Sequence, residues 1–74
     1  MADRITQKRL ENIVSRLSKI TGNTYRLDYA YGGVALENDT GSIQIFNTGH
    51  ISKKALYDNI FSVIQFLYFI DYKA

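Results

Sequence analysis

Few residues of this 74-residue chain have the types and spacing that chemistry requires. The chain has no cysteine and one histidine, His50, so it can build neither a thiolate site nor a multi-histidine metal site on its own. Asp28 and Glu37 would face each other across a hairpin, and paired carboxylates can bind a cation or act as acid and base. The sequence gives no sign of a cleft around these carboxylates. It also has no nucleophile–base pair and no phosphate-binding loop, and His50 is expected in a loop. We therefore expect a protein that is not an enzyme and holds no metal or cofactor.

The tripeptide Asp39-Thr40-Gly41 is similar to the active-site tripeptide of retroviral-type aspartic proteases, which build one site from two such loops in a dimer. The chain is too short for that barrel, and no flap segment or later glycine-rich loop is apparent. The tripeptide falls where a hairpin turn is needed, and we interpret it as that turn.

Alternating apolar and polar residues between Tyr25 and Thr48 predict three short antiparallel strands joined by two tight turns. A two-residue turn at Gly32-Gly33 would make Tyr31 face Val34. A turn at Thr40-Gly41 would set the register of the third strand with the second. The expected core face carries Tyr25, Leu27, Tyr29, Tyr31, Val34, Leu36, Ile43 and Ile45, and the expected outer face carries Arg26, Asp28, Ala30, Ala35, Glu37, Gln44 and Phe46.

An amphipathic helix is predicted on each side of this sheet. The first runs from about Arg4 to Thr21, with Asp3 as N-cap and Gly22 as the left-handed residue after its end. The second begins at Ser52, whose side chain can cap its first turn. The expected fold class is α+β, a helix–three-stranded antiparallel meander–helix (αβββα) with both helices on one face of the sheet, in a single domain of residues 1–74. The predicted buried stripes are Leu10, Ile13, Val14, Leu17 and Ile20 in the first helix, and Leu56, Ile60, Val63, Ile64, Leu67 and Ile70 in the second.

The second helix is apolar almost all round, and one small sheet with one helix cannot cover it. Exposed aromatic side chains would form a patch larger than soluble monomers usually carry. We therefore predict a homodimer in which the second helices pack together, with Phe66 or Phe69 near the two-fold axis. The competing explanation is a monomer that uses this surface to bind a different protein. The predicted interface residues are Tyr57, Phe61, Phe66, Tyr68, Phe69 and Tyr72.

The net charge of +2 is small for a dedicated nucleic-acid binder. Five of the nine basic residues lie on the first helix, and we interpret them as an ordinary solvated face because no aromatic residue interleaves with them. The alternative is a phosphate-contacting face that also uses the start of the second helix. Its candidate nucleic-acid contacts are Arg9, Arg16, Lys19, Lys53 and Lys54.

The segment Gly49-His50-Ile51-Ser52-Lys53-Lys54-Ala55 resembles the basic start of the second helix in double-stranded-RNA-binding domains, and the predicted element order is the same. The resemblance implies phosphate contacts across the major groove. The short Gly32-Gly33 turn departs from the family, whose first hairpin loop is longer and carries a histidine. The bulky second helix also departs, since the family's is rich in alanine.

A second resemblance is to small uncharacterised proteins of tailed phages and prophages. It is carried by Leu27-Asp28-Tyr29-Ala30-Tyr31-Gly32-Gly33, by Leu36, and by Lys54-Ala55-Leu56-Tyr57. It implies a phage context and a role in binding and redirecting a host protein. No signal peptide is apparent, and the apolar segment from Phe66 to Ile70 is far shorter than the ~20 residues that span a bilayer. We therefore expect a cytoplasmic location, in an infected or lysogenic host cell, and no membrane partner.

Overall fold

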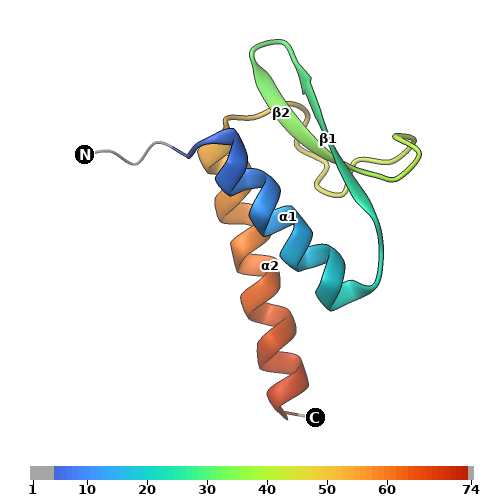
Figure 1. The fold of residues 1–74 in the computed structure, drawn as a ribbon, viewed down its shortest axis with the longest axis vertical. Helices are drawn as coiled ribbons and strands as arrows, with labels where there is room; N and C mark the ends of the chain where they lie inside the picture. The colour runs from blue at the N-terminus through green and yellow to red at the C-terminus, as the bar shows by residue number, and fades with distance from the viewer. Residues whose placement is uncertain (1–4, 74) are drawn as a thin grey trace.

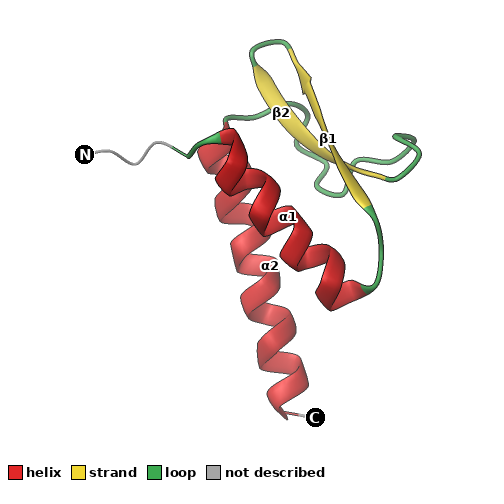
Figure 2. Ribbon diagram, viewed as in Figure 1, coloured by secondary structure: helices red, strands yellow, loops and turns green. Residues whose placement is uncertain are grey.

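Two helices and an antiparallel hairpin make up the fold, which is α+β as predicted (Figures 1 and 2). The structure is a computed structural model that describes the backbone of residues 5–73 and the side chains of residues 5–70. Within that part of the chain the sheet has two strands, so the third strand of the predicted αβββα arrangement is not formed. The elements, in chain order, are α1 Gln7–Thr21, β1 Tyr25–Ala30, β2 Gly33–Asn38 and α2 Lys53–Lys73.

Both ends of α1 carry residues that suit a helix terminus. Thr6 is the N-cap, and its hydroxyl accepts a hydrogen bond from the backbone N–H of Arg9 at 3.2 Å. The predicted start at Arg4 and the predicted cap, Asp3, lie outside the described residues. Gly22 has a φ of 78° and donates its backbone N–H to a carbonyl of the last turn at 2.8 Å, which confirms the predicted left-handed glycine.

The hairpin between β1 and β2 turns one residue earlier than predicted. Its central residues are Tyr31 and Gly32, whose φ angles of 55° and 73° are positive at both positions, as a type I′ turn requires. Val34 therefore faces Tyr29 and not Tyr31. Each side chain lies on the same face of the sheet in the predicted and the observed register, because its partner on the other strand shifts by an even number of positions. Alternation alone could therefore not distinguish the two registers.

After β2 the chain turns back and pairs with β2 at two separate places. Gln44 forms an isolated bridge with Glu37, which is the register predicted for the second turn. Ile51 forms a second bridge with Val34, through two backbone hydrogen bonds of 2.8 and 2.9 Å. Between the bridges the returning segment is longer than the stretch of β2 that it faces. Residues 46–49 therefore loop out, and this bulge prevents a continuous third strand.

The predicted core face of the sheet is only partly correct. Val34 and Leu36 are buried as predicted, and Leu27 packs against the core from β1. Tyr25 is partly buried and also packs against the core. The other four residues are exposed because the turn is displaced and the third strand is replaced by one bridge, which leaves these side chains outside the area that the helices cover. The exposed residues are Tyr29, Tyr31, Ile43 and Ile45.

Two residues predicted for the outer face are instead covered. Ala35 is 2% exposed, and its partner in β1 is Asp28. His50 crosses this face from the segment before α2, and its Nε2 lies 2.7 Å from Oδ2 of Asp28. Phe46 is partly buried and packs against the core. The loop that replaces the third strand therefore closes the second face of the hairpin.

One hydrophobic cluster joins α1, β2 and α2 (Figure 1). The helices pack against each other, and α1 also contacts β1 while α2 contacts β2. Figure 1 shows α2 continuing past the end of α1, which explains why Ile70, predicted in the buried stripe, is exposed. Neither helix, over the residues described, has the length and apolarity needed to cross a bilayer. The buried members of the cluster are Ile5, Leu10, Ile13, Val14, Leu17, Val34, Leu36, Leu56, Ile60 and Ile64.

Candidate functional site

The two carboxylates that were predicted to face each other are separated in the sheet. Asp28 faces Ala35 and contacts His50, whereas Glu37 faces Arg26, with 3.6 Å between Oε1 and Nε. The displaced turn causes the difference, and each carboxylate has a partner of its own. Among the described residues no group of three or more His, Asp and Glu side chains is arranged to hold a metal ion.

Asp39-Thr40-Gly41 forms a turn, as predicted. Gly41 has a φ of 78° and donates its backbone N–H to the Asn38 carbonyl oxygen at 3.1 Å. The hydroxyls of Thr40 and Ser42 lie 2.9 Å apart across the turn. These local hydrogen bonds account for the polar residues of the segment.

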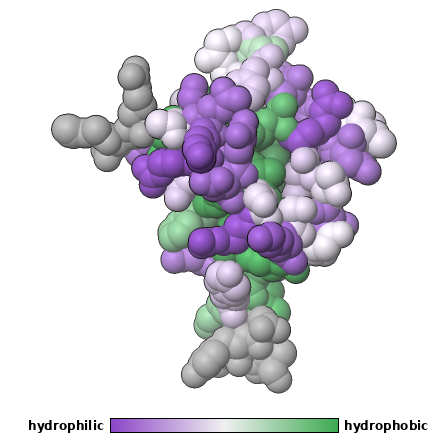
Figure 3. Space-filling model, viewed as in Figure 1, coloured by the Kyte–Doolittle hydropathy of each residue, from purple (hydrophilic) through white to green (hydrophobic). Residues whose placement is uncertain are grey.

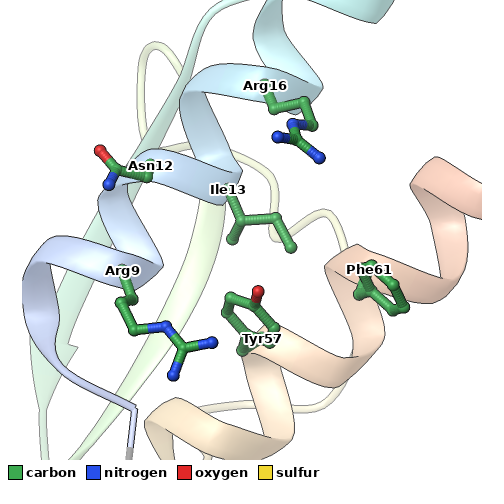
Figure 4. A pocket seen from close by; sticks show the side chains of 6 residues that line it. All are labelled: Arg9, Asn12, Ile13, Arg16, Tyr57 and Phe61. Atoms are coloured by element: carbon green, nitrogen blue, oxygen red, sulfur yellow. The ribbon is translucent and has the colours of Figure 1, made fainter.

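A shallow groove between α1 and α2 brings two sets of candidate residues together (Figure 4). The α1 residues follow the spacing of one helix face, with an arginine at each end and Ile13 between them. The two α2 residues are one turn apart. The hollow has a volume of about 200 Å³. We call it the α1–α2 groove, and its lining residues are Arg9, Asn12, Ile13, Arg16, Tyr57 and Phe61.

The aromatic side of the α1–α2 groove is ordered by ring contacts. The guanidinium carbon of Arg9 lies 5.4 Å from the ring centroid of Tyr57, a cation–π contact. The rings of Tyr57 and Phe61 are nearly parallel, at 10°, with centroids 6.4 Å apart. In Figure 4 the side chains of both arginines extend toward α2. The groove therefore presents two cations beside two aligned aromatic rings.

The groove places aromatic residues beside basic residues that the sequence separates. The basic residues of α1 were interpreted as a solvated face because no aromatic residue lies among them in the sequence. The structure supplies the aromatic residues from α2, since Tyr57 and Phe61 line the same groove as Arg9 and Arg16. Tyr57, a predicted interface residue, is half-buried and lies under Arg9. The i, i+3, i+4, i+7 spacing on α1 was visible in the sequence, but the facing helix was not.

The other predicted nucleic-acid contacts lie elsewhere. Lys53 lines a separate hollow beside the hairpin, with Tyr29, Gly32 and Ser52 among its neighbours. Lys54 pairs with Asp58 one turn later, at 3.0 Å. Lys19 is in the last turn of α1. Of the five predicted contacts, only Arg9 and Arg16 share the groove, and a surface of the double-stranded-RNA-binding type stays a prediction.

The second candidate surface is the C-terminal half of α2. Four of its large apolar side chains are between 47% and 60% exposed, although isolated soluble domains usually bury such residues. Figure 3 shows apolar residues reaching the surface in the lower part of the molecule, where α2 extends beyond α1. Phe61, also exposed as predicted, belongs to the α1–α2 groove and lies about one turn before this surface in α2. The side chain of Tyr72 lies outside the described part. We call this the distal α2 surface, formed by Phe66, Tyr68, Phe69 and Ile70.

Comparison of the chain with models of known protein families, with curated proteins and with solved structures finds no match.

Proposed function

We propose that this protein is a non-enzymatic protein-interaction module that forms a homodimer through the distal α2 surface. The exposure of Phe66, Tyr68 and Phe69 on one helical segment carries the proposal. Large aromatic residues are enriched at the centres of protein interfaces, where their burial contributes most of the binding free energy. Ile70 extends the apolar area by one turn, so a second copy of α2 would cover a continuous stretch of helix.

The proposal includes the biological setting suggested by the sequence resemblance. The protein would be a small accessory protein of the phage type, acting in the cytoplasm of an infected or lysogenic host cell. In that setting the dimer would bind a host protein and inhibit or redirect it. The competing form of the same proposal is a monomer whose distal α2 surface contacts the host protein directly.

Sedimentation velocity at about 10 μM, a concentration at which moderately stable interfaces associate, separates these two forms. The wild type is expected to sediment as a dimer. Phe66→Asp is expected to sediment as a monomer, because a carboxylate at the centre of an apolar interface has no partner there. Ser15→Asp is the matched control, since it adds the same charge at an exposed position of α1. A wild type that sediments as a soluble monomer would exclude the dimer and leave direct host-protein binding as the proposal.

A further inference from the structure

The α1–α2 groove has features that helix packing does not require. Its lining includes two arginines and no acidic residue. Among the described side chains neither guanidinium is paired with a carboxylate, although the structure does pair Arg26 with Glu37 and Lys54 with Asp58. Two like charges beside one hollow repel each other mildly, and an anionic ligand would relieve that repulsion. The groove is therefore complementary to an anion.

The spacing of the cations limits the shape of that anion. Arg9 and Arg16 are seven positions apart on α1, which at 1.5 Å per residue places their Cα atoms about 10.5 Å apart along the helix. Ile13 lies between them on the α1 side of the hollow. This spacing favours an extended ligand that carries charge on both sides of a less polar part.

The aromatic side of the groove indicates what that less polar part is. The Phe61 ring is 42% exposed, and it lies nearly parallel to the Tyr57 ring. Exposed aromatic faces bind planar rings by stacking, and a basic groove with aromatic residues is the arrangement by which proteins hold unpaired bases. The hollow, of about 200 Å³, suits one planar ring and not the width of a duplex.

We propose that the α1–α2 groove binds single-stranded nucleic acid. One base stacks on Phe61 beside Tyr57, and the phosphates on either side of it contact Arg9 and Arg16. This binding goes beyond the proposed protein-interaction function, because it uses a different surface. A failure of either proposal leaves the other standing, since the distal α2 surface and the groove are changed by different substitutions.

Fluorescence anisotropy of a labelled ten-nucleotide oligothymidine with the full chain tests the proposal, at about 50 and 200 mM salt. Two phosphate contacts predict that the logarithm of the affinity falls with the logarithm of the salt concentration with a slope of about −1.4. The double variant Arg9→Gln, Arg16→Gln is expected to lose roughly tenfold in affinity and most of this slope. Phe61→Leu keeps an apolar side chain without a ring, and it should lose roughly tenfold while keeping the slope.

The matched control is the double variant Lys8→Gln, Arg26→Gln. It removes the same charge from two exposed positions that do not line the groove, so it should bind almost as well as the wild type. Equal losses in the two double variants would overturn the proposal in favour of general attraction to a basic protein. Competition by polyglutamate as effective as that by unlabelled oligonucleotide would assign the groove to acidic peptides. Stronger binding of a duplex, or no binding at about 50 mM salt, would also overturn it.

Discussion

Gly33 lies where β2 comes closest to the segment that leads into α2. A Cβ atom there would be 2.9 Å from the Ile51 carbonyl oxygen and 3.0 Å from the His50 carbonyl carbon. These backbone atoms cannot rotate away, so Gly33→Ala must displace the segment and weaken the two hydrogen bonds between Val34 and Ile51. We expect the substitution to lower the free energy of unfolding by about 2 kcal/mol, measured by urea denaturation.

Gly32→Ala is the control for this prediction. Gly32 has a φ of 73° with open space around its Cα, so an alanine there meets only the cost of the left-handed conformation, about 1 kcal/mol. The sequence predicted the turn at Gly32 and Gly33, whereas Tyr31 and Gly32 have the positive φ angles. If Gly33→Ala cost no more than Gly32→Ala, close approach to Ile51 would not be the reason for a glycine at position 33.

The Tyr29 hydroxyl links stability to alkaline pH. Burial, and secondly the nearby Glu11 carboxylate, raise the pKa of Tyr29 above its ordinary value of 10.0. A group with a raised pKa in the folded state contributes stability below its unfolded pKa, and that contribution is lost as the pH rises through the folded pKa. Between about pH 9.5 and pH 11 the melting temperature of the wild type should therefore fall more than that of Tyr29→Phe. Circular dichroism melts at several pH values in this range measure the difference. Equal falls in the melting temperatures of the two proteins would contradict the assignment of this pH dependence to Tyr29.

At the scale of elements, the helices could be predicted and the sheet only in part. The stripes at positions 10, 13, 14 and 17 and at positions 56, 60 and 64 are buried, because helical periodicity reports directly which face is covered. The cap at Ser52 is also confirmed, since its hydroxyl accepts the backbone N–H of Ala55 at 3.1 Å. Local sequence determines these features, and no distant contact was needed to predict them.

The hairpin and the predicted third strand depended on contacts that local sequence does not specify. Two hairpin registers place the same side chains on the same face of the sheet. The observed register places Tyr31 in the turn and allows Gly33 to lie close to Ile51. The third strand was replaced because Ile51 also pairs with Val34, beyond the bridge at Gln44. Alternation of residues 43–46 predicted a strand, but within this stretch only the bridge at Gln44 forms, because the competing pairing of Ile51 is a tertiary effect.

Of the two candidate sites, one could be predicted from local sequence and the other could not. Exposure of Phe61, Phe66, Tyr68 and Phe69 was predictable, since they lie outside the buried stripe of one helix. The α1–α2 groove was not predictable, because it depends on how the two helices cross. Its lining residues come from both α1 and α2, which are far apart in the sequence.

At the scale of the whole molecule, the two surfaces lie along the same helix and affect stability differently. A chain of 74 residues buries roughly 60% of the surface that its unfolded form exposes, so its own core leaves a small stability margin. The groove lies beside the core, whereas the distal α2 surface lies beyond the end of α1 (Figure 1). Binding at the distal surface would therefore order the part of α2 that has least support from the rest of the chain.

This difference leads to a prediction about thermal stability. If two copies pack through the distal α2 surface, folding and association are coupled, and the melting temperature must rise with protein concentration. Dilution from about 100 μM to about 1 μM should lower the melting temperature of the wild type by roughly 5 °C or more. Phe66→Asp should melt at the same temperature at both concentrations, while Ser15→Asp should follow the wild type. A wild-type melting temperature that does not change on dilution would mean that a second copy does not stabilise this end of α2, which would then be left for a different protein to cover.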